Sequence, residues 1–179
     1  MPCGASRETA ERSDLADWCN YGYCASHSRY FWGLRLHLLT TPDGAVVAWC
    51  LADPKIGDRE VAHAMLKRWP LRPALHIIAD KGYAGQEFED AIRKLGATLI
   101  RPDRRNERRR HGKLGWVRQR IESINDTLKG QLGLEEHGGR TRTGVTVRVA
   151  QRVLALTAGV WHNWLTDAPC KRSLVANDH

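Results

Sequence analysis

The sequence has no long hydrophobic run and no low-complexity tract. None of its apolar stretches approaches the ~18 residues that a membrane-spanning helix needs, which excludes an integral membrane protein. The opening segment, MPCGASRETAERSD, has no apolar stretch behind its first basic residue. We therefore expect no secretory signal and a cytoplasmic location.

The cysteines lack the spacing of a metal site. They are Cys3, Cys19, Cys24, Cys50 and Cys170. None of them forms a CxxC pair, and the pair Cys19 and Cys24 has no second His or Cys pair at the spacing of a zinc site. Because the number is odd and no signal is evident, we expect free thiols and no cysteine chemistry.

Acidic residues are scarce in one segment. The whole chain has 28 Lys and Arg against 20 Asp and Glu, a net charge of +8. Residues 101–120 hold nine of the basic residues and only two acids, Asp103 and Glu107, so the rest of the chain is close to neutral. Such a concentration of positive charge favours a nucleic-acid groove, and a solvated basic loop is the alternative.

The remaining composition is that of a globular protein. At 179 residues with 42% hydrophobic and 27% charged residues, the chain suits one domain with its own core. We divide it into a polar N-terminal remnant at 1–29, a domain at 30–165 and a tail at 166–179.

Apolar periodicity predicts an α/β chain with the order β-β-α-β-α-β-α-α. Residues 1–29 show no clear period and are interpreted as irregular, apart from a helical turn near 8–18. The expected elements are hairpin strands at 30–40 and 45–52, a helix capped by Asp58, a strand at 75–79, a helix at 86–95, a strand at 97–100, and helices at about 115–132 and 144–165.

Two acids stand where they could do chemistry. Asp80 follows a short apolar strand in IIADKGYAG, and ligands of open α/β sheets bind at the carboxyl ends of strands. Glu122 lies on the helix expected at 115–132, four residues after Arg118 and seven before Lys129, so these three side chains share one face. A loop-capping Asp and a solvent-facing helix with ion pairs are the alternatives.

From Tyr21 to about Leu165 the chain resembles the catalytic domain of bacterial insertion-sequence DDE transposases. The resemblance lies in the hairpin YFWGLRLHLL…AVVAWCLAD, the strand end IADKGYAG and the helix signature Tyr-x2-Arg-x3-Glu-x6-Lys. Arg118, Glu122 and Lys129 match the last three positions of that signature, whereas Gly115 stands at the Tyr position.

The resemblance implies a ribonuclease H-like mixed sheet with flanking helices and an active site for DNA strand cleavage and transfer at transposon ends. It implies two Mg²⁺ or Mn²⁺ ions held by two Asp and one Glu, with Asp80 as the second carboxylate and Glu122 as the third. Lys81 and Tyr83 would be neighbours of this site. Contacts to DNA phosphates are expected from Arg118, Lys129, Arg104, Arg105, Arg108, Arg109 and Arg110.

The first carboxylate has no match in this sequence. In the family it lies on a central strand before the hairpin, and residues 1–29 contain no apolar strand that ends in Asp. We therefore expect a truncated, inactive copy without that strand, against a complete enzyme that uses a substitute Asp. A non-catalytic basic DNA-binding or transposition-interfering module is the competing function, and a homodimer is one assembly open to either. The substitute candidates are Asp14, Asp17, Asp43, Asp53 and Asp58.

Overall fold

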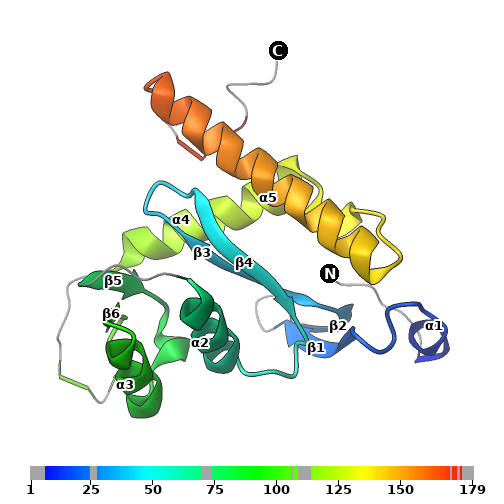
Figure 1. Ribbon diagram of the computed structural model, residues 1–179, viewed down its shortest axis with the longest axis horizontal. Helices are drawn as coiled ribbons and strands as arrows, with labels where there is room; N and C mark the ends of the chain where they lie inside the picture. Colours follow the sequence, from blue (N-terminus) through cyan, green and yellow to red (C-terminus); the bar gives the residue numbers. More distant parts are fainter. Residues whose placement is uncertain are drawn as a thin grey trace. The chain divides into compact units, whose positions relative to one another are not determined.

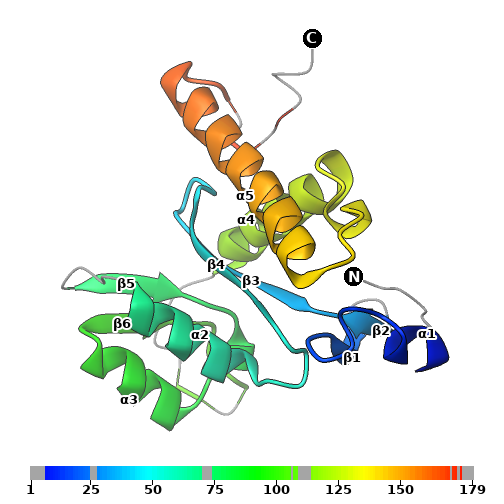
Figure 2. The same cartoon turned by 45° about the vertical axis from the view of Figure 1, so that its right-hand side comes forward.

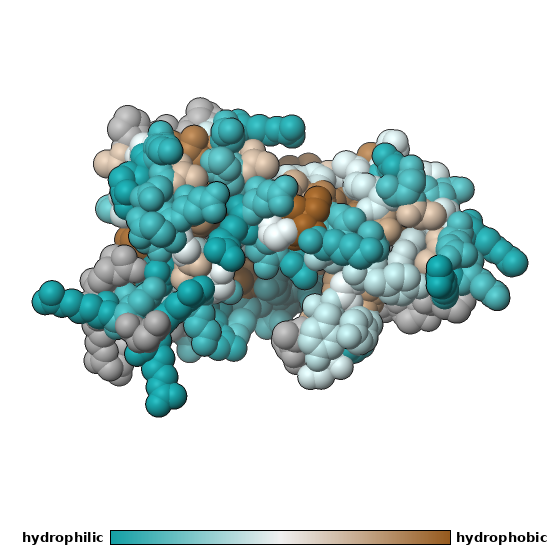
Figure 3. All heavy atoms as spheres, turned by 90° about the horizontal axis from the view of Figure 1, so that it is seen from below, coloured by the Kyte–Doolittle hydropathy of each residue, from teal (hydrophilic) through white to brown (hydrophobic). Residues whose placement is uncertain are grey.

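A computed structural model describes residues 7–24, 28–69, 74–105, 107–108, 114–169, 171–172 and 174. The chain divides into two compact units, one formed by Met1–Ile56 with Ser123–His179 and the other by Gly57–Glu122. Within the described residues, no helix has the length and apolar character needed to span a bilayer. Hydrophilic side chains cover most of the face shown in Figure 3.

The first unit combines two antiparallel strand pairs with a long helix. Its elements are α1 (Arg7–Glu11), β1 (Asn20–Cys24), β2 (Arg29–Gly33), β3 (Arg35–Thr40), β4 (Val46–Ala52), the π-helical segment η3 (Thr127–Gln131), the 3-10 turn η4 (Leu134–Glu136) and α5 (Arg142–Leu165) (Figure 1). The helix α4 (Gly115–Asp126) continues along the chain from the second unit into η3.

The core of the first unit lies under α5. Val145, Val149 and Val153 pack with Leu15 and Cys19, and partly buried side chains of the β3–β4 hairpin complete this cluster. A second cluster joins α4 and η3 to the C-terminal half of α5 through Ile124, Leu128, Leu156 and Val160. α5 contacts β4 of the hairpin, and Figure 2 shows these two elements from another side. The apolar face expected for the last helix is thus confirmed.

The segment 30–40, expected to form one hairpin strand, forms two strands. Only β3 pairs with β4, while β2 pairs with β1. Gly33, at the end of β2, has a φ of 154°, a backbone angle that residues with a side chain rarely adopt. The chain therefore leaves one sheet and enters another at this glycine.

β1 is a strand that the sequence analysis did not predict. It lies in the polar segment that we expected to be irregular, and its register with β2 places Tyr23 opposite Tyr30, with ring centroids 5.1 Å apart. Gly22 lies so close to Phe31 that a Cβ atom there would be 2.7 Å from the Phe31 ring. Cross-strand aromatic packing of this kind stabilises an antiparallel pair in a segment with little buried apolar surface.

The second unit contains a parallel strand pair. Its elements are α2 (Asp58–Arg68), β5 (Leu75–Ile78), the 3-10 turn η2 (Lys81–Tyr83), α3 (Gln86–Lys94), β6 (Ala97–Ile100) and the first part of α4. α3 connects β5 to β6 and packs on β6, with Phe88 and Ile92 buried. Gly96, with a φ of 82°, ends α3 in the left-handed conformation, as expected of a C-terminal glycine.

The described strands pair as β1–β2 and β3–β4 in the first unit and as β5–β6 in the second, so the single mixed sheet that we expected is not confirmed. The expected cap of α2 needs correction. Gly57 caps α2 with an extended backbone and Asp58 is the first helical residue, one position later than expected. An acid in the first turn is favourable without acting as the cap, because the helix dipole attracts it there.

The cysteines in the described part of the chain are free thiols at Cys19, Cys24 and Cys50. Burial raises the pKa of the Cys19 thiol to about 11, which keeps it protonated at neutral pH. A protonated, buried thiol is a poor nucleophile and metal ligand.

His137 gives the fold a pH dependence. Its buried ring accepts a hydrogen bond from the Gly139 N–H at Nδ1 (2.9 Å), and burial lowers its pKa below the usual 6.5. The unfolded chain therefore binds a proton more readily, so the free energy of unfolding should fall as pH drops below about 6.5. His137→Asn, which keeps an acceptor, should flatten this fall in urea titrations between about pH 7 and 5. The same substitution at exposed His162 should not, and equal pH dependence in the two variants would contradict the prediction.

Candidate functional site

Asp80 stands at the carboxyl end of β5, as its position in the sequence predicts. Ala79 still pairs with β6 through its N–H to the Ile100 carbonyl (3.0 Å), and the chain then turns. The Asp80 Oδ1 atom caps that turn by accepting the Gly82 N–H at 2.7 Å. The side chain is exposed, and Oδ2 makes no hydrogen bond to any described residue. Asp80 thus combines the capping role with one carboxylate oxygen available for a ligand.

Gly82 is required for space in this turn. A Cβ atom on Gly82 would lie 2.9 Å from Asp80 Oδ1 and would push the carboxylate away. Of the two expected neighbours, Tyr83 packs on Phe88, with ring centroids 5.8 Å apart, and Lys81 is exposed. Tyr83 therefore helps to fix the turn on α3, whereas Lys81 is accessible to solvent.

Glu122 and Arg118 form an ion pair on α4, which corresponds to the alternative of a solvent-facing helix with ion pairs. The Arg118 Nε atom donates to Glu122 Oε1 at 2.8 Å, and the side chains are 83% and 55% exposed. An ion pair with this much exposure contributes little to stability, because water competes for both groups. The carboxylate of Glu122 can therefore exchange its partner at low cost.

Lys129 lies outside the regular part of this helix. It belongs to η3, where the hydrogen-bond pattern changes from α to π, so the 100° spacing assumed from Arg118 onward does not extend to it. Its Nζ atom pairs with Glu135 Oε1 at 3.2 Å. The contact of Lys129 with DNA remains a prediction.

The basic loop that follows β6 is anchored by a buried arginine. Arg101 is 4% exposed and forms ion pairs with Glu89 on α3 (2.7 Å) and Glu107 in the loop (2.7 Å). Glu107 also accepts the Arg104 N–H at 2.8 Å. Half-buried carboxylates thus hold the start of the loop against α3, a role for Arg101 that the sequence analysis did not predict.

The other arginines of the loop differ in their surroundings. Arg104 donates from Nη2 to the Ala84 carbonyl at 3.1 Å. Arg105 and Arg108 are exposed, and neither guanidinium is bonded to a described residue. The expected contacts at Arg109 and Arg110 lie outside the described residues.

The sequence analysis also did not single out Arg59, which bonds to the turn after Asp80. It lies in the first turn of α2 and donates from Nη1 to the same Ala84 carbonyl, at 3.3 Å. The only sequence signal is a basic residue in a helical first turn, where acids are usual. That signal does not indicate which loop the side chain reaches.

Two of the candidates for a substitute first carboxylate, Asp17 and Asp53, are hydrogen-bonded to other residues. Asp17 forms an ion pair with Arg142, which lowers the pKa of that carboxyl group. Asp53 accepts hydrogen bonds from Asn20 and from the Lys55 N–H. Among the residues that the structure describes, no three His, Cys, Asp or Glu side chains are grouped as a metal site requires. Asp80 and Glu122 supply the hard oxygen donors that Mg²⁺ and Mn²⁺ prefer, but as two carboxylates rather than three.

Residues 8–158 match the family model described as Transposase DDE domain. Comparisons with curated proteins and with solved structures gave no significant match. The matched segment runs from α1 through the basic loop and α4 into α5, and it includes Asp80 and Glu122. The chain belongs to the transposase DDE domain family, whose members act in DNA transposition.

Proposed function

We propose that this chain is an inactive copy of the catalytic domain of an insertion-sequence transposase of the Tyr-Arg-Glu-Lys class, a domain that acts on DNA at the ends of its element. The observation that carries the proposal is the Asp80 turn. A carboxylate at the end of a parallel strand, with one oxygen committed to the Gly82 N–H and the other available, suits a metal ligand. The family match and the Arg118–Glu122 pair on α4 support it.

In this proposal Asp80 and Glu122 hold Mg²⁺ or Mn²⁺ together. Two such ions, when bound, stabilise the entering and leaving oxygens of a phosphodiester during in-line displacement. The hydrogen bond from the Gly82 N–H fixes the orientation of the Asp80 carboxylate. Arg118 pairs with Glu122 in the absence of metal, and a divalent cation would replace it as the partner of that carboxylate. Arg118 is then free to contact DNA phosphate.

The chain on its own should not cleave DNA at a measurable rate. The resemblance calls for three carboxylates, and only Asp80 and Glu122 stand at matching positions. With two ligands in place of three, the geometry needed for in-line attack is not held. The test incubates the purified chain and DNA carrying the ends of its element with Mn²⁺, alongside Asp80→Ala and Glu122→Ala. Cleavage by the wild type that disappears in both variants would contradict the prediction and return the search for a first ligand to Asp14, Asp17, Asp53 and Asp58.

The alternative function is a DNA-binding module that interferes with transposition without catalysis. The concentration of arginines in the basic loop supports it independently of any carboxylate. Addition of the chain to a full-length transposase of the same element separates the two functions. Interference predicts inhibition of transposition that persists in Asp80→Ala, whereas an inactive copy without an interfering role predicts no inhibition by either the wild type or Asp80→Ala.

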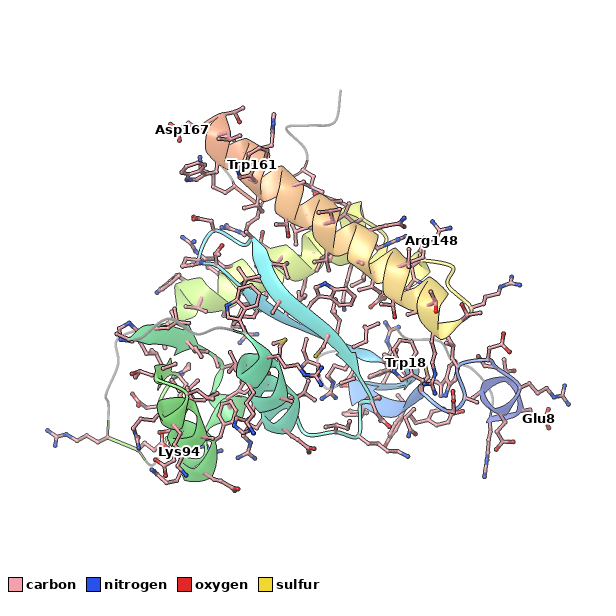
Figure 4. The ribbon with its side chains drawn as sticks, viewed as in Figure 1. Glu8, Trp18, Lys94, Arg148, Trp161 and Asp167 are labelled. Carbon is pink, nitrogen blue, oxygen red and sulfur yellow. The ribbon has the colours of Figure 1, made fainter. Side chains whose placement is uncertain are left out.

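A homodimer is the assembly that we propose for the first unit. Val147, Leu154 and Trp161 follow one another at intervals of seven residues on α5, opposite its buried face, and are 47%, 68% and 62% exposed (Figure 4 labels Trp161). Sevenfold spacing is the pattern of a helix that packs on another helix. The arginines of α5 lie in its N-terminal half and it has no acid, so an antiparallel second copy keeps like charges apart.

Leu154→Glu should therefore shift the chain toward the monomer in sedimentation velocity. The substitution places a charge at the centre of the apolar stripe, where it would lose water on association. Thr146→Glu adds the same charge to the same helix, about 80° around the helix axis from Leu154, and serves as the control. A wild type that sediments as a monomer, or equal effects of both substitutions, would reject the proposed dimer.

A further inference from the structure

Two arginines from different parts of the second unit meet at one carbonyl oxygen. Arg59, in the first turn of α2, and Arg104, at the start of the basic loop, both donate to the Ala84 carbonyl, at 3.3 and 3.1 Å. Ala84 is 1% exposed and ends the turn that Asp80 begins. Two guanidinium groups are thereby brought together at the far end of the Asp80 turn.

This pair of cations has no counter-charge among the residues that the structure describes. Neither guanidinium forms an ion pair with any of them, in contrast to Arg101, which is bound by two carboxylates. A peptide carbonyl is a dipole, so it satisfies a hydrogen bond at each arginine without neutralising either charge. Each guanidinium has five N–H donors, and the Ala84 carbonyl occupies one on each. The remaining donors and the excess charge favour an anion at this point.

The backbone is shaped to allow the approach. A Cβ atom on Gly85 would lie 2.5 Å from the Arg59 Nη1 atom, so any side chain at this position would displace the guanidinium. The φ of Gly85 is 167°, an extended value open to other residues, so space rather than backbone conformation accounts for glycine here. Gly85 therefore permits Arg59 to reach the Ala84 carbonyl, where Arg104 also donates.

We infer that Arg59 and Arg104 together bind one backbone phosphate of DNA beside the Asp80 turn. A phosphodiester carries one negative charge and two free oxygens, which match the planar donors of two guanidinium groups. The inference rests on the proposed function for the identity of the polyanion, and it adds a phosphate position that Arg118 and Lys129 do not supply. A phosphate held at Ala84 would place the DNA strand next to the Asp80 carboxylate.

The test measures DNA binding without cleavage. A short duplex of arbitrary sequence is titrated with the full chain in EDTA, and anisotropy is recorded from about 50 to 200 mM KCl. Arg59→Gln and Arg104→Gln should each weaken binding by about 3- to 10-fold at about 0.1 M salt. Because the two arginines share one phosphate, the double variant should lower the salt slope by only about one and should depart from the product of the single effects.

Arg68→Gln is the matched control. It removes the same charge from the other end of α2, where the side chain is exposed, and should change affinity by less than about 2-fold. Single effects equal to that of Arg68→Gln, or a double variant equal to the product of the singles, would overturn the inference, as would a wild type that binds no DNA. Inorganic phosphate that competes equally with wild type and double variant would likewise exclude a site at these arginines.

The inference and the proposed function can fail separately. Loss of DNA binding in Arg59→Gln is measured without metal, whereas the role of Asp80 and Glu122 is measured as Mn²⁺ binding without DNA. Arginine-dependent DNA binding by a chain that binds no Mn²⁺ would retain the phosphate site and reject the metal site. Mn²⁺ binding that is lost in Asp80→Ala and Glu122→Ala, together with DNA binding that is indifferent to Arg59 and Arg104, would do the reverse.

Discussion

Replacing Arg101 with methionine should lower the free energy of unfolding by about 3 kcal/mol, the largest effect that we expect from a single substitution. The guanidinium is 4% exposed and bonds to Glu89 through Nε (2.8 Å) and to Glu107 through Nη1 and Nη2 (2.7 and 2.9 Å). Hydrogen bonds with Glu107 and Glu89 raise the pKa of Arg101. Without Arg101, two partly buried carboxylates lose their buried cationic partner.

The pH dependence of that loss identifies its cause. A partly buried carboxylate that has lost its cationic partner is destabilised in its charged form, so the penalty is present at neutral pH and disappears as the group takes up a proton. The difference between wild type and Arg101→Met in urea denaturation should therefore shrink as pH falls from about 7 toward 4. A loss caused only by the missing side-chain volume would be independent of pH.

Two further variants complete the test. Arg93→Met removes an exposed arginine that pairs with Asp90 on α3, and it should cost little by comparison. Glu89→Gln with Glu107→Gln, added to Arg101→Met, removes the two charges that have lost Arg101 and should restore part of the stability. A loss for Arg101→Met no larger than that for Arg93→Met would show that the buried ion pairs do not stabilise the unit.

The elements that the sequence predicted well are those whose buried faces repeat. The face of α5 and the β5–α3–β6 unit follow from the spacing of apolar residues, because burial of those residues drives the packing directly. The place of Asp80 follows from the same argument, since it needs only the end of a strand. Its hydrogen bond to the Gly82 N–H corresponds to the loop-capping alternative, and the Oδ2 atom, which is bonded to no described residue, leaves the ligand role open.

What the sequence did not reveal depends on contacts between distant residues. β1 is stabilised by aromatic residues that meet across a pair of strands, and it lacks the apolar run that the analysis looked for. Arg101 looks like one more residue of a basic loop until Glu89 and Glu107 are seen beside it. Arg59 gives no local sign that it reaches Ala84, twenty-five residues away. Polar contacts of this kind depend on which distant residues the fold brings together, and they leave no periodic pattern in a single sequence.

The second large effect should come from neutralising the basic loop. Replacement of its five central arginines with glutamine should lower affinity for non-specific duplex DNA by roughly 100-fold or more at about 0.1 M salt. The slope of log K against log salt should fall by up to about 4 to 5 units, because each phosphate that the protein no longer neutralises keeps about 0.9 of a counterion on the DNA. Arg105 and Arg108 support this expectation, since their exposed guanidinium groups are bonded to no described residue. The set is Arg104, Arg105, Arg108, Arg109 and Arg110.

The control must remove the same charge from elsewhere, because net charge alone attracts DNA over long range. Five exposed arginines of the first unit serve this purpose: Arg7, Arg12, Arg29, Arg140 and Arg148. Both five-residue variants have the same net charge, so they differ only in where the charge was removed. A binding surface at the basic loop predicts a steep fall in the salt slope for the first set and a small one for the second. Equal slopes would mean that the loop is a solvated surface and that DNA responds to the charge of the whole chain.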